Sequence, residues 1–113
     1  MVGKTVAPDR GDIVWISLNR QTGHEQAGRR PVLVLSPRAY NQKVGLALCC
    51  PITSQQKGYP FEVELPADAA VTGVILADQV KCLDWRARKA EVAGTVPSEA
   101  IAETLGKLAS LLQ

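Results

Sequence analysis

The chain alternates short apolar runs with polar segments that contain glycine and proline, and this spacing limits the folds open to it. Apolar runs of about four to eight residues between turn residues are typical of strands rather than helices. The expected strands are residues 12–19, 30–35, 46–52, 61–65, 73–77, 80–83 and 89–96. Strands at this spacing favour a mainly β fold, a small antiparallel barrel or half-barrel, over a doubly wound sheet.

The pattern changes at Ser98, where apolar residues begin to recur at helical spacing. Glu99 in the first turn and Lys107 near the end suit the helix dipole. The sequence therefore predicts a C-terminal amphipathic helix. Its apolar face consists of Ile101, Leu105, Leu108 and Leu112.

The length and net charge of the chain limit its number of domains and its possible binding partners. A chain of 113 residues is expected to form a single domain, 1–113. A net charge of +2 does not by itself indicate nucleic-acid binding, so any site for a polyanion depends on local clustering. No apolar run approaches ~18 residues and the N-terminus has no apolar leader, so we expect a cytoplasmic protein without a membrane span.

Cysteine usage points in the same direction. Cys49, Cys50 and Cys82 form no C-x-x-C motif and have no histidine at metal-binding spacing. An odd number of cysteines, two of them adjacent within an apolar run, indicates reduced thiols in the core of a cytosolic protein. We therefore expect neither a disulfide nor a metal site.

The stretch from Gly23 to Ser36 joins a polar, charged segment to a buried strand. Residues 23–30 are rich in cationic and proton-handling groups, and residues 31–35 are apolar. A side chain at this junction has a fixed base and a free head group, which is how many sites are built. Arg30 is therefore the first candidate, whereas Arg29 should point the other way, as a solvated or backbone-binding charge.

A punctuated segment follows this strand. Ser36 is expected to cap a short helical turn with Pro37 at its first position. Residues 38–42 would form the turn, and Gly45 would end it.

Several stretches together resemble one known family. They are GDIVW, GHEQAGRRPVLVLSPRAYN, PITSQQKGYPFEVEL, GVILADQV and LDWRAR, in this order. They are similar to the MazF/PemK toxins of bacterial toxin–antitoxin systems, and the MazF branch in particular. The resemblance implies an SH3-like barrel with a C-terminal helix, assembled as a homodimer. It also implies a cofactor-free, metal-independent endoribonuclease for single-stranded RNA, largely mRNA. A cognate antitoxin would silence it by laying an acidic tail across the RNA groove.

The resemblance assigns roles to four residues. Arg30 matches the catalytic arginine of the MazF branch, and a planar guanidinium suits phosphoryl oxygens. The alternative role for Arg30 is a surface ion pair with Glu25. Thr53 matches the second catalytic position, and its alternative is a hydrogen bond within its own turn. Glu25 would act as general base or orient Arg30, and Lys57 would bind phosphate. Without the resemblance both would be solvated loop charges.

The Kid/PemK branch uses a different constellation, which this chain retains only in part. His24 and Asp78 match its histidine and aspartate, but Leu76 replaces the strand arginine. His24 remains a candidate acid or base because imidazole titrates near neutrality, although a loop histidine is by default simply exposed. Asp78 and Gln79 are expected to hydrogen-bond a base edge or the loops around the site.

Further contacts with RNA are expected from aromatic and cationic residues. Tyr59 could stack on a base, and Phe61 could do so unless it belongs to the core. Trp15 is expected in the core or at a dimer seam. Arg86 and Arg88 form a local cationic patch for RNA phosphate or an acidic antitoxin, unless they merely belong to a solvated turn.

Two other functions compete with RNA cleavage. CcdB-type gyrase poisons share the fold but rely on an aromatic and small residues at the extreme C-terminus. This chain instead ends in Leu111, Leu112 and Gln113, and it keeps Arg30 and Thr53. A catalytically silent SH3-like binding module is the third possibility.

Overall fold

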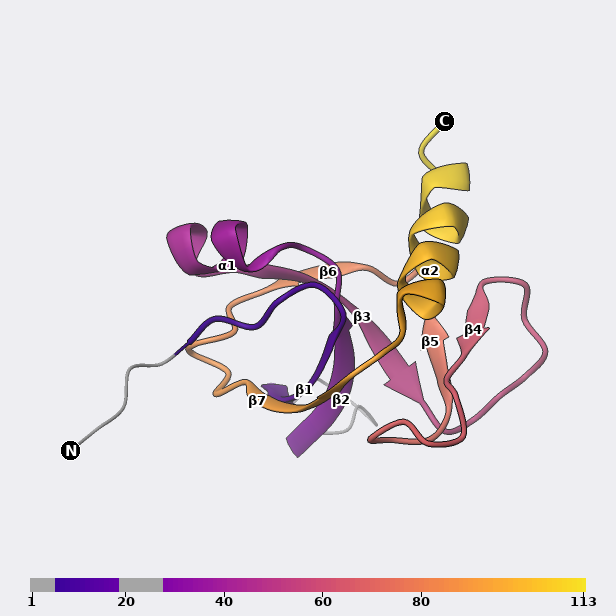
Figure 1. The fold of residues 1–113 in the computed structure, drawn as a ribbon, viewed down its shortest axis with the longest axis horizontal. Coiled ribbons are helices and arrows are strands. Elements are labelled where there is room, and N and C mark those ends of the chain that lie inside the picture. The colour runs from indigo at the N-terminus through magenta and orange to yellow at the C-terminus, as the bar shows by residue number, and fades with distance from the viewer. Residues whose placement is uncertain (1–5, 19–27) are drawn as a thin grey trace, which may run out of the picture.

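The computed structural model describes residues 6–18 and 28–113, which form one antiparallel sheet and two helices. The elements are β1 (Asp12–Leu18), β2 (Gly28–Val34), α1 (Arg38–Val44), β3 (Ala47–Thr53), β4 (Glu62–Glu64), β5 (Val74–Leu76), β6 (Lys81–Leu83), β7 (Glu91–Thr95) and α2 (Ser98–Ser110). Figure 1 shows the sheet curling between α1 at one end and α2 at the other. The expected mainly β fold with a C-terminal helix is confirmed.

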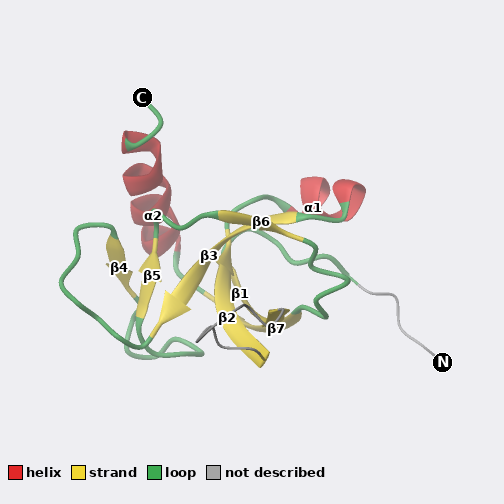
Figure 2. Cartoon of the chain, turned by 180° about the vertical axis from the view of Figure 1, so that it is seen from behind, coloured by secondary structure: helices red, strands yellow, loops and turns green. Residues whose placement is uncertain are grey.

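The strand order makes β3 the meeting point of the sheet. The order is β4-β5-β3-β2-β1-β7, and β6 pairs with β3 outside this path. β5 pairs with the end of β3 at Ile52 and Thr53, whereas β6 pairs with its start, from Ala47 to Cys49. β3 therefore pairs with β2 and also with two short strands, first β6 and then β5 (Figure 2).

Successive residues of the central strands enter two separate cores, as alternation across a pleated strand requires. The first core includes Ile13, Leu33, Cys50 and Ile52, with Val63, Ile75 and Ala77 from the later strands. The second core includes Val14, Ile16, Val32, Val34 and Cys49, with Leu83 and Trp85. Burial on both faces explains why the strand at residues 12–18 lacks a polar face.

α2 covers the first core as its periodicity predicts. Ile101, Leu105 and Leu108 pack against that core, and Ala100 is buried within it. The expectation for Leu112 was wrong, because this residue lies beyond the end of α2 and is 77% exposed. No helix in the described part of the chain is long and apolar enough to cross a membrane.

The expected cap at Ser36 was also wrong. The N-cap of α1 is Pro37, which makes no side-chain cap bond, and Asp9 Oδ1 accepts from the Arg38 backbone N–H at 2.9 Å. The Ser36 hydroxyl instead donates to Asn41 Oδ1 at 2.6 Å and accepts from the Leu48 backbone N–H at 2.8 Å. The buried amide of Asn41 competes successfully for the hydroxyl because an unpaired buried polar atom is costly.

Cys49 and Cys50 are buried core thiols as expected, but Cys82 is exposed. All three are free. Burial raises the pKa of Cys49 and of Cys50 to about 12, so both stay neutral. Cys82 lies on β6 opposite Leu48, which is itself 40% exposed, so this cross-strand pair faces away from the buried cores.

Gly73 allows β3 and the turn before β5 to approach closely. Its φ is +128°, and a Cβ added there would lie 2.1 Å from the Thr53 carbonyl oxygen. We expect Gly73→Ala to lower the free energy of unfolding by roughly 2–4 kcal/mol, measured by urea denaturation. Gly106→Ala in α2 is the control: it meets nothing within 4 Å, and we expect it to stabilise by up to about 1 kcal/mol. Equal urea midpoints for Gly73→Ala and the native chain would contradict the steric argument.

Candidate functional site

The hydrogen-bonded ladder between β2 and β3 is short. It runs from Val34–Cys49 to Val32–Pro51 and ends there, although β2 continues to pair with β1 as far as Gly28. Alternate residues of β2 bond to β3, as the Leu35 N–H does to the Leu48 carbonyl, so the next bonded pair would be Pro31 and Ile52. Pro31 has no backbone N–H to donate to it. The strands separate beyond this point, and a cavity of about 850 Å³ opens between their ends.

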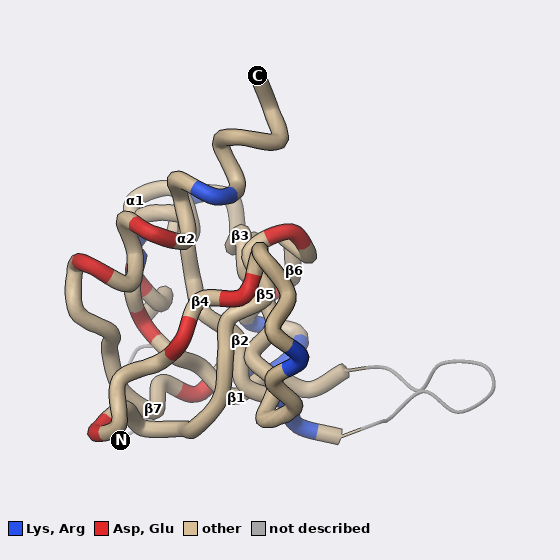
Figure 3. Tube along the Cα trace, turned by 90° about the vertical axis from the view of Figure 1, so that its right-hand side faces the viewer, with Lys and Arg blue, Asp and Glu red and all other residues tan. Residues whose placement is uncertain are grey.

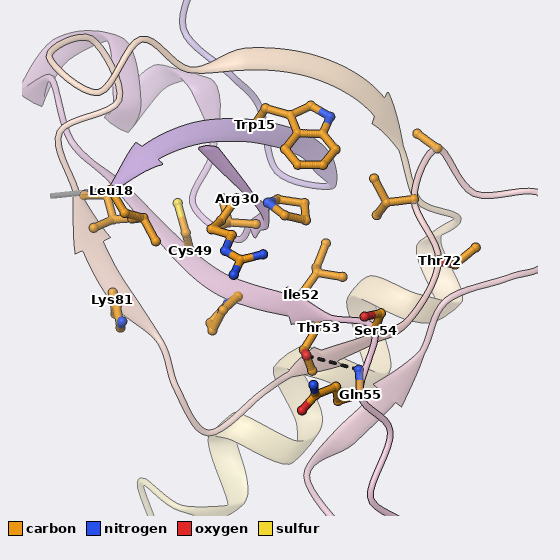
Figure 4. A pocket seen from close by; sticks show the side chains of 16 residues that line it. Trp15, Leu18, Arg30, Cys49, Ile52, Thr53, Ser54, Gln55, Thr72 and Lys81 are labelled. Carbon is orange, nitrogen blue, oxygen red and sulfur yellow. Dashed lines mark hydrogen bonds between the residues drawn. The ribbon is translucent and has the colours of Figure 1, made fainter. Parts of the chain in front are cut away.

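Arg30 and Thr53 flank this gap. If the register continued past Val32–Pro51, these two residues would face each other. Both line the cavity, and Figure 4 shows the Arg30 guanidinium reaching into its middle, on the side toward Thr53. The fold thus brings together two residues that lie far apart in the chain.

Thr53 is oriented by its own turn. Its Oγ1 accepts a hydrogen bond from the Gln55 backbone N–H at 3.2 Å, drawn as a dashed line in Figure 4. A hydroxyl has one proton to donate as well as lone pairs to accept with. The turn therefore occupies an acceptor site of Thr53 and leaves its proton available to a ligand in the cavity.

The two adjacent arginines of β2 differ in their surroundings. Arg29 is held by backbone and side-chain acceptors: Ser17 Oγ at 2.8 Å, Trp15 O at 3.0 Å and Lys89 O at 2.7 Å. It is the backbone-binding charge that its position predicts. Arg30 is half-buried, and within residues 6–18 and 28–113 its guanidinium makes no hydrogen bond or ion pair.

A second cavity, of about 510 Å³, lies on the other side of Thr53. Lys57, Tyr59 and Gln79 line it, so three of the expected RNA-binding residues lie together. Thr53 and Gln55 line both cavities, so they lie between the two.

Asp78 supports the wall of this second cavity. The Tyr59 hydroxyl donates to Asp78 Oδ2 at 2.7 Å, which raises the pKa of Tyr59. The other oxygen, Oδ1, is buried without a hydrogen-bond partner in the described part of the chain. Of the two expectations for Asp78, contact with a loop around the site is the one this geometry matches. Phe61 is half-buried, with its ring 6.0 Å from that of Tyr59.

The two arginines of the expected cationic patch differ: Arg88 is held by a hydrogen bond, and Arg86 is exposed. Arg88 Nη1 donates to the Ser17 carbonyl at 3.1 Å. Arg86 is exposed and stacks over Trp85, with its guanidinium carbon 4.8 Å from the ring centroid. Figure 3 shows basic segments near the ends of β1 and β2, whereas acidic segments predominate on the other side of this view.

The sequence did not indicate that Trp15 and Lys81 line the large cavity. Trp15, expected in the core or at a dimer seam, is half-buried and lines the large cavity, as Lys81 does. No sequence signal marks these positions, because the cavity exists only where β2 and β3 separate. His24 and Glu25 lie outside the described residues. Among those described, no three His, Cys, Asp or Glu side chains lie close enough to hold a metal ion.

The hydrogen bond from Tyr59 to Asp78 raises the pKa of the Tyr59 phenol, and a titration can measure this. The neutral phenol donates this bond, so its contribution to stability is complete below the ordinary tyrosine pKa of 10.0 and is lost as pH rises through the raised value. In a Tyr40→Phe background Tyr59 is the sole phenol of the chain, so its titration can be measured by ultraviolet absorbance. In this background Asp78→Asn should lower the pKa of Tyr59 toward 10.0. Asp84→Asn removes an equivalent charge elsewhere and should leave the titration unchanged. Identical curves for the two variants would exclude Asp78 as the cause.

Comparisons with known proteins agree on one family. The family model described as PemK-like, MazF-like toxin of type II toxin–antitoxin system matches residues 9–112. Endoribonuclease toxin MazF of Escherichia coli K12 is 54% identical over 99 residues, which cover 88% of this chain and 87% of that protein. Endoribonuclease PemK of E. coli is 36% identical over 108 residues, covering 92% and 81%.

Solved structures give the same result. The chain superposes on a MazE–MazF crystal structure from Deinococcus radiodurans with a TM-score of 0.89 and 56% identity, covering 96% of this chain and 97% of the matched one. The match covers nearly the whole chain. The chain belongs to the PemK-like, MazF-like family of type II toxin–antitoxin toxins.

Proposed function

We propose that this chain is a sequence-specific, metal-independent endoribonuclease toxin that cuts single-stranded RNA, chiefly mRNA, and so stops translation. The observation that carries the proposal is the placement of Arg30 and Thr53 on opposite sides of one cavity. The proposal is also supported by the 54% identity of this chain to an E. coli protein named as an endoribonuclease toxin.

Metal-free cleavage uses the 2′-hydroxyl of the RNA as the nucleophile. This oxygen attacks the adjacent phosphorus, and the bond from phosphorus to the 5′-oxygen breaks. The protein has to hold the two oxygens in line and stabilise the charge on the pentavalent phosphorus. Arg30 offers two parallel N–H groups to the non-bridging oxygens, and the Thr53 hydroxyl donates a further hydrogen bond.

Proton transfer falls to other residues. An arginine stays protonated, so Arg30 stabilises charge but does not act as acid or base. His24 and Glu25 are the groups we propose for this task, Glu25 either removing the 2′-hydroxyl proton or orienting Arg30. Both precede β2 closely in the chain, Glu25 by three residues and His24 by four.

RNA on either side of the cut would be held around the second cavity and by the cationic turn. Lys57 can bind a phosphate there, while Tyr59 and Gln79 present a ring and polar atoms to a splayed base, and Asp78 holds the Tyr59 hydroxyl in place. Exposed Arg86 can track the backbone, and Arg88 shapes the turn beside it through its bond to Ser17.

We further propose a homodimer that a cognate antitoxin silences in the cytoplasm, where mRNA is found. The support is the matching MazE–MazF complex of D. radiodurans. An acidic, otherwise disordered tail suits the same cationic positions as RNA, namely Arg30, Lys57 and Arg86, and would exclude RNA from the groove by competition.

Arg30→Ala tests the catalytic assignment directly. We expect its cleavage rate on a long single-stranded RNA in excess EDTA to be about 100- to 1000-fold lower, because a donor to the developing charge is lost. Lys43→Ala removes one positive charge from exposed α1 and should cleave like the native chain. Cleavage is followed on gels, and the fragment ends give the recognition sequence.

The same assay separates the competing functions. Discrete fragments from the native chain and from Lys43→Ala, but not from Arg30→Ala, support a metal-free ribonuclease centred on Arg30. Equal cleavage by all three proteins would refute the role of Arg30. RNA left intact by the native chain across several unrelated sequences would refute the enzyme itself and leave gyrase trapping or simple binding to be tested.

A further inference from the structure

The loop between β3 and β4 carries Lys57 and Tyr59 to the second cavity, and its shape decides where they point. Residues 54–61 have no regular secondary structure, and Gly58 has a φ of +76°. A loop of this kind loses conformational freedom when it binds a ligand, which weakens binding unless something has already ordered it. The structure contains such an ordering element in Glu62.

Three successive backbone N–H groups of this loop converge on one carboxylate. Glu62 Oε2 accepts from Lys57 N at 3.0 Å, and Oε1 accepts from Gly58 N at 3.1 Å and from Tyr59 N at 3.2 Å. Successive N–H groups that point to one place form an anion-binding nest. Here the chain fills the nest with its own anion, so the nest itself is not open to a phosphate of the substrate.

Other contacts hold the same loop from outside. The Glu62 backbone N–H donates to the Tyr59 carbonyl at 3.0 Å. Lys107 Nζ of α2 donates to the Pro60 carbonyl at 2.5 Å and to the Glu62 carbonyl at 3.3 Å. Glu62 is therefore linked both to the loop and to the helix that covers the first core, which makes it a rigid support.

The arrangement leaves the side chains of the loop for a ligand. Glu62 binds the backbone N–H of Lys57, and in the described part of the chain the Lys57 ammonium forms no ion pair. Lys57, Tyr59 and Gln79 line the cavity together with Glu62. The carboxylate acts on the backbone, and the cation beside it stays available for a phosphate.

We propose that Glu62 is a positioning residue for RNA recognition, which orders the Lys57–Tyr59 loop before the substrate binds. This inference rests on the proposed ribonuclease function. Glu62 would act on binding of the RNA beside the cut and not on the chemical step at Arg30 and Thr53. Loss of the carboxylate should raise KM and leave kcat nearly unchanged.

The matched variants are Glu62→Ala, Glu62→Gln and Glu64→Ala. Glu64 lies two residues along β4 and is exposed. Among the residues that the structure describes, its carboxylate accepts only a side-chain hydrogen bond, from Gln56 Nε2 at 3.3 Å. Its removal changes the net charge as Glu62→Ala does but leaves the nest intact. Glu62→Gln keeps size and an acceptor oxygen, so it tests the proposal even if Glu62→Ala is poorly folded.

The first readout is hydrogen exchange at the amides of Lys57, Gly58 and Tyr59. We expect faster exchange at all three in Glu62→Ala, an intermediate rate in Glu62→Gln, and the native rate in Glu64→Ala. Unchanged exchange in both Glu62 variants would show that the carboxylate does not order the loop, and would overturn the proposal.

The second readout separates positioning from a general structural role. We expect KM for single-stranded RNA to rise roughly tenfold or more in Glu62→Ala, with less than about a threefold change in kcat, since charge-assisted hydrogen bonds to the loop are lost. A fall in kcat at native KM would overturn the proposal while the ribonuclease function stands.

Binding of an RNA blocked at the cut by a 2′-O-methyl group keeps the two proposals distinguishable. We expect Glu62→Ala to bind this RNA about tenfold more weakly than the native chain and Glu64→Ala do. Equal binding by all variants overturns the role of Glu62. Intact RNA in the cleavage assay together with this binding difference would remove the ribonuclease function but support Glu62 as an organiser of an RNA-binding loop.

Discussion

The separation of β2 from β3 after the Val32–Pro51 pair is the constraint on which the site depends. Pro31 deprives the ladder of a donor at the next bonded pair, and the strands diverge. A continuous ladder would leave no room for a ligand between Arg30 and Thr53. The gap converts two strand ends into the two walls of a cavity, while the ladder behind it holds both walls at a defined spacing.

The rigidity of these walls comes from the two cores. Behind Arg30 and Thr53 the strand residues alternate between the cores, as in Val32, Leu33 and Val34 of β2, so neither strand can slip by one residue without exposing an apolar row. Thr53 is fixed further by the close approach of Gly73 to its carbonyl. A charged head group on such a base loses little freedom when it binds a phosphoryl group, which favours catalysis through prior organisation.

A cationic side chain at the site is available to the substrate only if protein acceptors do not already bind it. Arg29 and Arg30 are neighbours in the chain, yet carbonyl acceptors hold the first and the cavity receives the second. The small net charge conceals this difference. The same logic applies to anions: the Glu62 carboxylate is taken up by three N–H groups and so shapes the loop, leaving Lys57 to meet the substrate.

Local pattern was sufficient for the strands and the C-terminal helix, because burial leaves a periodic record in the sequence. Pattern failed at Leu112, Cys82 and Ser36, where a helix end, an edge strand and a buried amide changed the surroundings of an ordinary-looking residue. The juxtaposition of Arg30 with Thr53 and the filling of the nest by Glu62 were decided only by the tertiary structure. They depend on strand register and on hydrogen-bond geometry, which join groups across the fold and leave no periodic trace in the order of the residues.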